Sequence, residues 1–599
     1  MKVIPQNPEK NMNKIIEDIN KAKDMWKDMI IFPELAVPWY MLWDSWEQNW
    51  FVRDCISMNE EIIESTKWKI TAIWWNVYVD EDNIWEDWRL RKYNSAYIAS
   101  DWKLVNNNIF NWVMHKTLMP KYRMFDDRRH FTSMQNMALE NWKNINEYFE
   151  PFNVIIDWIK KKVWITICED LWDDSYCVKP VNELKKNWSD IIVNISSSPY
   201  YIWKHSDREL LLQRQSKDTS IYYSNNVWVQ NNWKNYYIMD WDSAIYKDWK
   251  KINSRVTLDE TIITETKEDI NDFEYSEIWA IHKKIIYWIK EFFNQIWKQK
   301  VVIGLSWGLD SAVVAGLMVE AIWKENVIAI NMPSKYNSNT TKDLAEKLAN
   351  NLGIEYKIIW IEESVIHTKN QIEEVFWTKI EWIVDENIQA RDRWARILAA
   401  VAANENAVFT NNGNKTEIAL WYATLYWDVA WAISPIWDLY KTQVFELARY
   451  MNRNIEIIPN EIIDMKPSAE LSDNHNVDEW MWDPMIYEYH DKIFYKLIEE
   501  REDIETILEK YITWDINEYL WMENKFIEEI FNTWEEFIND LEKIYKSFRI
   551  NFFKRIQCPP IISVSKRAFG FDFREAQNWV YFTRKYRKLR EEVMNIDKN

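Results

Sequence analysis

The fold of the second half of the chain is decided by the stretch Val301-Val302-Ile303-Gly304-Leu305-Ser306-Trp307-Gly308-Leu309-Asp310-Ser311. Its β-branched start predicts a buried strand, and the Ser/Gly-rich part that follows predicts a loop opening a helix. Such a loop presents backbone N–H groups and a helix N-terminus to an anion. The lysine of the GxxxxGK[ST] pattern is missing. The stretch therefore predicts either a phosphate-binding loop of another kind or an ordinary strand-to-helix turn.

The alternation of strands and helices continues on the C-terminal side of this stretch. Further strands are expected over 327–331, 356–361 and 407–410, with helical segments between them. Strands that alternate with helices form a parallel, doubly wound sheet. From about 486 to 554 the pattern is helical, and it indicates no role for that region.

The first half also predicts an α/β fold. The expected elements are strands over 29–32, 69–73, 163–167, 190–194 and 228–230, and helices over 12–25 and 208–222. A charged, strand-poor stretch over 259–272 is typical of a linker. We therefore expect a first domain over 1–257, a linker over 258–274 and a second domain over 275–599.

The composition excludes several classes of protein. With 599 residues, 47% apolar and 28% charged, the chain is expected to be globular and to form at least two domains. It has no run of about 18 apolar residues and no secretory pattern at its start, so neither a membrane segment nor export is expected. The net charge of −20 disfavours a nucleic-acid partner. Four cysteines without a CxxC pair predict neither disulfides nor a zinc site. The expected class is a cytoplasmic protein that acts on small molecules.

The contents of glycine and tryptophan are abnormal. The sequence has 6 Gly and 41 Trp, which together make 47 residues, close to a usual glycine content of about 7%. Trp102 and Trp241 fall at expected turn tips, Trp297 at an expected helix C-cap and Trp164 before an apolar run, where the pattern favours glycine. A tryptophan-rich protein is the alternative. We predict that most Trp letters stand for glycine, as in bacterial lineages that read the UGA codon as Gly, and that Trp172 is a genuine tryptophan.

With Trp307 read as Gly, residues 306–311 resemble the Ser-Gly-Gly-x-Asp-Ser pyrophosphate loop (PP-loop) of the ATP-pyrophosphatase family. Later segments narrow the resemblance to the NAD synthetases; they are 386–394, 412–417, 421–428, 434–444, 466–471 and 554–560. Asn412 departs from the family pattern, because threonine is usual at that position. Each segment alone is a modest match, but their order along the chain is specific.

The resemblance implies a role for each matching residue. ATP would be bound by Gly304, Leu305, Ser306, Trp307, Gly308, Leu309, Asp310, Ser311 and Asn412. Mg²⁺, which prefers carboxylate and phosphate oxygens, would be held by Asp310 and Glu417. Deamido-NAD would be contacted by Asn387, Glu417 and Lys554. The reacting centre would be lined by Asp428 and Lys441.

The first half contains residues suited to releasing ammonia from an amide. Glu34 and Cys168 each follow a strand-like run, and Lys116 begins the segment Lys116-Thr117-Leu118-Met119-Pro120. A cysteine that attacks an amide needs a base for its proton and a cation for the oxyanion. When Cys168 is considered alone, a buried, inert thiol is the better explanation. The three segments together resemble the Glu-Lys-Cys triad of the nitrilase superfamily, whose fold is an αββα sandwich.

Within this resemblance, Cys168 is the nucleophile, Glu34 the general base and Lys116 the oxyanion partner. The backbone N–H of Glu169 would complete the oxyanion site. Glutamine would be bound by Tyr122, Ser198 and Lys204. Lys121 is expected at the surface, and none of the seven histidines is given a chemical role.

Both halves together are similar to the glutamine-dependent NAD⁺ synthetases. The resemblance implies that ammonia from glutamine amidates deamido-NAD at the expense of ATP, with Mg²⁺, giving NAD⁺, AMP, pyrophosphate and glutamate. It also implies a homo-oligomer. Two alternatives stay open. One is another ATP-pyrophosphatase amidotransferase, such as one that makes GMP or asparagine, and the other is an inactive scaffold in which every Trp is literal.

Overall fold

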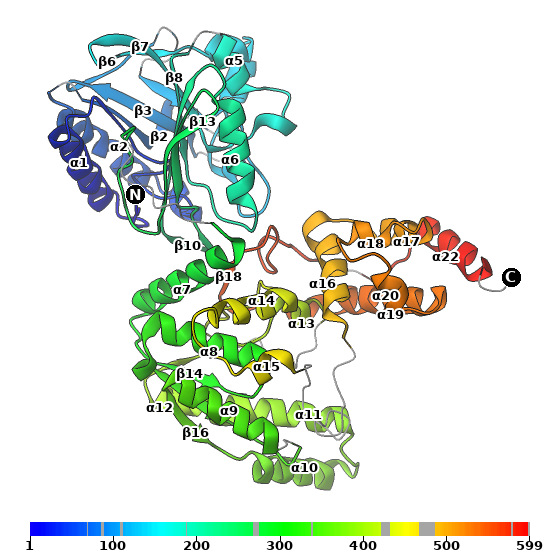
Figure 1. Cartoon of the computed structure of the whole chain (residues 1–599). Coiled ribbons are helices and arrows are strands. Elements are labelled where there is room, and N and C mark those ends of the chain that lie inside the picture. The colour runs from blue at the N-terminus through cyan, green and yellow to red at the C-terminus, as the bar shows by residue number, and fades with distance from the viewer. Residues whose placement is uncertain are drawn as a thin grey trace. The chain divides into compact units, whose positions relative to one another are not determined.

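The computed structural model describes all residues except 69, 85–88, 108, 110–111, 187–188, 267–274, 337–338, 421–431, 466–484, 577–578 and 597–599. The chain forms two compact units (Figure 1). Unit 1 comprises Met1–Asn232 and Tyr237–Glu274, and unit 2 comprises Trp233–Tyr236 and Tyr275–Asn599. Among the described helices, none combines the length and the apolar character needed to cross a membrane.

Unit 1 contains two β-sheets. The first has the order β1-β2-β3-β4, with β5 also paired to β3; its strands are β1 (Met29–Ile31), β2 (Thr71–Ile84), β3 (Leu90–Ser100), β4 (Lys103–Leu104) and β5 (Val113–His115). The second has the order β13-β12-β9-β8-β7-β6; its strands are β6 (Phe152–Ile156), β7 (Ile159–Ile167), β8 (Ile191–Ser196), β9 (Ser220–Asn225), β12 (Asp242–Lys247) and β13 (Lys250–Val256).

Helices cover the outer faces of these two sheets (Figure 1). The helices α1 (Pro8–Asp24) and α2 (Asn49–Ser65) lie on the side of the first sheet, and Asn59 of α2 accepts a hydrogen bond from the Trp74 indole of β2 at 2.9 Å. The helix α6 (Lys204–Gln215) lies on the side of the second sheet, where Arg208 pairs with Asp242 of β12. The predicted αββα sandwich is therefore confirmed.

The register of the second sheet determines which residues meet at its edge. Strands β7, β8 and β9 are parallel, with Ile167 opposite Ile195 and Ser196 opposite Asn225. The carboxyl ends of parallel strands lie at one edge of a sheet, and such edges bind ligands in α/β folds. The residues that follow these ends are Cys168 after β7, Ser197 after β8 and Asn226 after β9.

Unit 2 contains a four-stranded parallel sheet. Its order is β16-β15-β14-β17, formed by β14 (Val301–Gly304), β15 (Val327–Asn331), β16 (Glu355–Ile358) and β17 (Val408–Phe409). The helices between these strands include α8 (Leu309–Ile322), α9 (Asn339–Leu352) and α12 (Ala399–Asn404). The prediction of a doubly wound parallel sheet is confirmed.

The C-terminal part of unit 2 is helical, as predicted. Its longer helices are α16 (Tyr487–Tyr495), α17 (Ile504–Ile512), α20 (Trp534–Ile550) and α22 (Arg584–Ile596). They share one apolar core that includes Phe494, Leu508, Phe537 and Tyr586. Burial of this common core explains why a stretch rich in charged residues stays folded.

One predicted helix extended too far. The pattern over 208–222 predicted a continuous helix, but α6 ends at Gln215 and residues 220–225 form β9. Alternate side chains of Ile221 and Tyr223 are buried, which is the period of a strand. In the expected linker, residues 257–266 have neither helix nor strand, and residues 267–274 lie outside the described part of the chain.

Tryptophans occupy an unusual share of the left-handed backbone positions. Of the 28 non-glycine residues with positive φ in the described part of the chain, 17 are Trp. Trp102 (φ 58°) and Trp297 (φ 57°, the C-cap of α7, Glu277–Ile296) are among them, as predicted. Because the Cβ atom makes this region costly for residues other than glycine, the distribution favours glycine at these positions.

Three tryptophans at positions where the sequence predicts glycine do not follow that rule. Trp164, Trp241 and Trp307 are at most 6% exposed and have no positive φ, so the turn tip with positive φ expected at Trp241 is wrong. Trp172, which was predicted to be genuine, has a φ of −93°. Backbone conformation therefore separates the tryptophans into two groups, and position 307 belongs to the group that does not require glycine.

Replacing Trp297 with Gly is expected to stabilise the protein. The indole is 92% exposed, so its loss removes little buried area, while relief of the left-handed backbone contributes about 1 kcal/mol. The midpoint of urea unfolding should rise. As a control, Trp74→Gly removes a fully buried indole and should lower the midpoint, with a cost of about 3 kcal/mol or more. A lower midpoint for Trp297→Gly would contradict the glycine interpretation.

Candidate active sites

Cys168 lies at the point where β7 ends. It starts the 3₁₀ turn Cys168–Leu171, is 3% exposed, and has a φ of +47°. A residue other than glycine in this conformation is strained, and such strain is found most often at functional sites. Burial, together with the nearby Glu34 carboxylate, raises the pKa of the thiol, and Lys116 opposes this only in part. The thiol is therefore protonated at rest and needs a base before it can attack.

A buried lysine links two carboxylates beside this thiol. The Lys116 Nζ atom lies 2.9 Å from Glu34 Oε1 and 2.7 Å from Asp127 Oδ2, and all three side chains are at most 1% exposed. Burial opposes the charge on Lys116, but Asp127 and Glu34 raise its pKa well above the usual value. Lys116 is therefore a fixed cation. The structure brings Glu34, Lys116 and Cys168 together, and Asp127 is a partner of Lys116 that the sequence did not indicate.

Three amide groups fix the position of Glu34. Asn94 Nδ2 donates to Glu34 Oε1 at 2.9 Å, and the backbone N–H of Ser197 donates to Oε2 at 3.0 Å. Asn226 Nδ2 donates to the backbone carbonyl of Glu34 at 2.8 Å. Asn94 in turn accepts from the Trp75 indole at 2.5 Å. These contacts come from both sheets of unit 1, so the carboxylate has one fixed orientation.

Asp170 joins the cysteine segment to the lysine segment. Its carboxylate accepts from the backbone N–H groups of Leu118 (2.7 Å), Thr117 (3.1 Å) and Ile167 (3.1 Å). Burial raises its pKa to about 7, although these N–H donors oppose the shift. Thr117 and Leu118 follow Lys116 directly, while Ile167 precedes Cys168. The acid therefore holds the two reactive side chains in a common frame.

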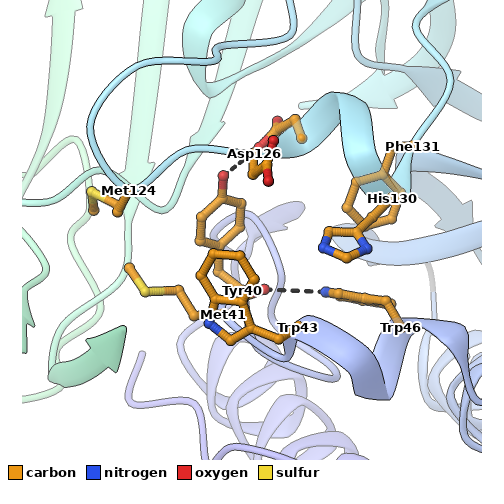
Figure 2. Close-up of a pocket in the computed structure, with 9 residues that line it drawn as sticks. Tyr40, Met41, Trp43, Trp46, Met124, Asp126, His130 and Phe131 are labelled. Atoms are coloured by element: carbon orange, nitrogen blue, oxygen red, sulfur yellow. Dashed lines mark hydrogen bonds between the residues drawn. The ribbon is translucent and has the colours of Figure 1, made fainter. Parts of the chain in front are cut away.

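A small apolar hollow borders the Lys116 site (Figure 2). It is lined by Tyr40, Met41, Trp43, Trp46, Met124, Asp126, Asp127, His130 and Phe131. The Tyr40 hydroxyl donates to Asp127, and the Trp46 indole donates to the Tyr40 carbonyl at 3.2 Å. Asp127 thus connects the wall of this hollow with Lys116.

The three residues predicted to bind glutamine lie around the same cysteine. Lys204 Nζ donates to Ser198 Oγ at 2.6 Å and to the Pro199 carbonyl at 3.0 Å. The Tyr122 hydroxyl donates to Glu169 Oε2 at 2.9 Å. Burial lowers the pKa of Lys204 to about 8. Lys121 is exposed, as expected.

In unit 2, the loop after β14 is closed by serine hydroxyls. Ser306 Oγ and Ser311 Oγ lie 3.0 Å apart, and Ser306 Oγ accepts from the Gly308 N–H at 3.1 Å. Ser311 Oγ lies 2.9 Å from the Gly308 carbonyl. The loop opens directly onto α8, so backbone N–H groups and the helix N-terminus gather at one place.

Asp310 lies at the centre of a charged cluster. Its carboxylate forms an ion pair with Lys441, the first residue of α14 (Lys441–Met451), and accepts from Asn414 Nδ2 at 3.0 Å. The Asn414 N–H donates to Glu417 Oε2 at 3.2 Å. The structure therefore brings the predicted residues Asp310, Glu417 and Lys441 together, with Asn414 as the connecting residue that the sequence did not indicate.

The other residues predicted for the site of unit 2 are less closely connected to the Asp310 cluster. Asn412 Nδ2 donates to the Gly304 carbonyl at 3.0 Å, which places it against the loop. Asn387 donates to Ile383 within its own helix, α11 (Trp382–Arg391), and is not joined to the Asp310 cluster. Lys554 is half-buried on α21 (Phe552–Arg555). Asp428 and the segments 421–428 and 466–471 lie outside the described residues.

A second buried lysine supports this cluster. Lys415 is fully buried and lies 2.9 Å from Asp438, 2.5 Å from Glu499 and 2.7 Å from Ser565 Oγ. It is the first residue of the short helix α13 (Lys415–Leu420) that carries Glu417, and Asp438 lies three residues before Lys441. Lys415 therefore ties the two segments that deliver Glu417 and Lys441. In the described residues, His, Cys, Asp and Glu side chains form no group of three suited to a metal.

Some known proteins are similar to nearly the whole chain, and others are similar to part of it. The NAD synthase family model matches residues 281–525. The glutamine-dependent NAD(+) synthetase of Synechocystis sp. is 28% identical over 94% of this chain and 95% of its own length. The NH(3)-dependent NAD(+) synthetase of Fusobacterium nucleatum is 37% identical over 38% of this chain and 83% of its own length.

A solved structure agrees with the fold of the whole chain. The glutamine-dependent NAD+ synthetase of Acinetobacter baumannii, in complex with ADP, superimposes with a TM-score of 0.66 and 23% identity over 96% of each chain. Because the Fusobacterium nucleatum relative is 37% identical over 83% of its own length, the chain belongs to the NAD synthetase family.

Proposed function

We propose that the chain is a glutamine-dependent NAD⁺ synthetase that amidates deamido-NAD with ammonia released from glutamine. ATP would be cleaved to AMP and pyrophosphate, and glutamine would be converted to glutamate. In this proposal residues 1–257 form the glutaminase, 258–274 a linker and 275–599 the synthetase. The observation that carries the proposal is the fully buried Glu34–Lys116 pair beside Cys168, because a lone inert thiol requires no such charges.

The side chains of unit 1 support attack of a thiol on an amide. Glu34 would take the proton of Cys168, and the thiolate would attack the side-chain carbonyl carbon of glutamine. Lys116 and the Glu169 N–H would stabilise the oxyanion. Collapse of this intermediate releases ammonia, which takes its third proton from Glu34, and leaves a thioester on Cys168. Water, deprotonated by Glu34, would hydrolyse the thioester to glutamate and restore the thiol.

The charged cluster of unit 2 supports adenylation. Backbone N–H groups of the loop 305–308 and the hydroxyls of Ser306 and Ser311 would bind the phosphates of ATP. Lys441 would compensate the charge of the departing pyrophosphate. Asp310 and Glu417 supply the hard oxygen ligands that suit Mg²⁺, which when bound neutralises phosphate charge. Deamido-NAD would be contacted by Asn387, Glu417 and Lys554, with Asp428 at the reacting centre.

We also infer a homo-oligomer in the cytoplasm. Large apolar side chains that are at least 39% exposed lie on two neighbouring helices of unit 2, α10 (Glu362–Phe376) and α11; they include Val375, Phe376, Ile383 and Val384. An exposed apolar group of this kind is typical of a protein contact. A second copy of the chain is the partner that the family resemblance implies.

Cys168→Ala should abolish NAD⁺ formation driven by glutamine and retain formation driven by ammonium chloride, because only the first needs the thiol. Cys177→Ala is the matched control; Cys177 is exposed, and both reactions should continue. NAD⁺ is measured by an enzymatic assay, with deamido-NAD compared against xanthosine monophosphate and aspartate as acceptors. Turnover of either rival acceptor would favour the alternative amidotransferase.

Asp310→Asn should lower ammonia-driven synthesis about 100-fold, because it removes one charge from the cluster that faces Lys441. The Mg²⁺ concentration that gives half-maximal activity should also rise. Asp343→Asn, at an exposed position on α9, is the control and should leave the rate unchanged. An Asp310→Asn rate within twofold of the unchanged enzyme would rule out this role.

We further infer that tryptophans with positive φ are glycines in the natural polypeptide. Mass spectrometry of peptides from the protein purified from its own cells should find Gly at Trp102 and Trp297 and Trp at Trp172. If the indoles are present at positions 102 and 297, or the gene has UGG codons there, the inference is wrong. In that case the inactive scaffold becomes the stronger alternative.

A further inference from the structure

The helical region of unit 2, for which the sequence indicates no role, places a buried carboxylate beside the charged cluster of this unit. Asp491 lies on α16, which packs beside α13 and α14 (Figure 1), and it is 2% exposed. Its Oδ1 atom accepts from the Thr416 hydroxyl, and its Oδ2 atom accepts from the Thr442 N–H at 2.8 Å. Thr416 precedes Glu417, and Thr442 follows Lys441. One side chain therefore binds both segments that carry these two predicted site residues.

The same contacts account for the N-terminus of α14. The Lys441 N–H donates to Thr416 Oγ1 at 3.0 Å, and the next N–H, that of Thr442, donates to Asp491. The first N–H groups of a helix lack partners within the helix, and a negative charge is favoured beside them. Asp491 therefore caps α14 from another helix. The Thr416 hydroxyl extends this contact, because it donates to Asp491 and accepts from Lys441.

The charge of Asp491 is compensated by neutral donors. Among the described residues, no Lys, Arg or His nitrogen lies within ion-pair distance of its carboxylate. Burial raises the pKa of this carboxyl to about 6, and hydrogen bonds from Thr416 and Thr442 oppose the shift. The side chain is therefore mainly charged at neutral pH. An apolar core that includes Ile418 and Phe494 already joins these helices, so adhesion alone does not require a buried charge.

A second carboxylate of the same helical segment contacts α13. The chain of α16 continues into the π-helical turn Lys496–Glu500, where Glu499 lies 2.5 Å from Lys415 Nζ. Asp491 and Glu499 are eight residues apart, about two helical turns, which places them on one side of the segment. Lys415 directly precedes Thr416. The helical region therefore holds the start of α13 through two adjacent residues.

We propose that Asp491 is a positioning residue for the synthetase reaction. By binding Thr416 and Thr442, it fixes the start of α13 relative to the start of α14. The orientation of Glu417 towards Lys441 follows from this constraint, and a misplacement of about 1 Å is enough to slow a reaction about 100-fold. The inference rests on the proposed synthetase function and gives the helical region a part in it.

The test measures NAD⁺ formation from deamido-NAD, ATP, Mg²⁺ and ammonium chloride, so the glutaminase takes no part in the readout. Asp491→Ala removes both acceptors and should lower kcat at least about tenfold, the scale expected for loss of a hydrogen bond to a charged group. The KM for ATP should change less, since Asp491 does not contact the loop 305–308. Asp491→Asn keeps an oxygen for the Thr442 N–H but loses the second acceptor, so its kcat should lie between the other two.

Asp540→Asn is the matched control. Asp540 lies on α20 and pairs with His490, the neighbour of Asp491, at 3.1 Å. The substitution removes a carboxylate from the same helical region without touching α13 or α14, so kcat should stay within twofold. Thr416→Val removes only the relaying hydroxyl and should lower kcat. Its loss should not add to that of Asp491→Asn, because both changes break the same contact.

A kcat for Asp491→Ala within twofold of the unchanged protein would overturn the inference. An equal loss in Asp540→Asn would also overturn it, because it would indicate a general loss of stability. Thermal melting checks that each variant is folded at the assay temperature. If Asp491→Ala does not fold, Thr416→Val decides, and an unchanged kcat in that variant counts against the proposal.

Hydrogen exchange separates this inference from the proposed function. Absence of NAD⁺ formation by the unchanged protein would refute the synthetase function, but the contacts of Asp491 can still be measured. The amide hydrogen of Thr442 should exchange at least about tenfold faster in Asp491→Ala than in the unchanged protein, and Asp540→Asn should show no such increase. Equal exchange in all three proteins would overturn the positioning role.

Discussion

A buried lysine shared between two carboxylates organises unit 1. Lys116 follows β5, Glu34 follows β1 and Asp127 begins a short helix, so one ammonium group fixes three separate segments. Removing one partner from such a group leaves an uncompensated buried charge, at a cost of about 3–5 kcal/mol. Unit 2 uses the same device, since Lys415 joins Asp438 and Glu499 below the Asp310–Lys441 pair. The reactive geometry of both units thus depends on buried cations.

These buried charges explain how the two chemistries stay specific. In unit 1 burial raises the pKa of the thiol, so in the proposed reaction Glu34 must accept its proton before it can attack. In unit 2, Asn414 donates from its side chain to Asp310 and from its backbone N–H to Glu417, so one residue holds both acids. Both sites are preorganised before a substrate binds.

The strands, and the motifs with their order along the chain, could be predicted from the sequence because each depends on neighbouring residues only. Runs such as Val301–Gly304 follow from composition, and Glu34, Lys116 and Cys168 follow from their surroundings in the sequence. Asp127, Asn94 and Asn414 could not be predicted, because each acts through a partner far along the chain. The polar pattern of residues 216–222 fits the period of a strand as well as that of the predicted helix. Pairing with β8 places residues 220–225 in a strand. Trp307 needed no positive φ, so any requirement for glycine there would come from the approach of phosphate.

Transfer of nitrogen from glutamine to deamido-NAD is tested most directly with an isotope. The protein is supplied with deamido-NAD, ATP, Mg²⁺ and glutamine labelled with ¹⁵N in its side-chain amide, and the product is examined by mass spectrometry. The account predicts NAD⁺ that carries one ¹⁵N in the nicotinamide group. Unlabelled NAD⁺, or glutamate formed with no NAD⁺ at all, would contradict it.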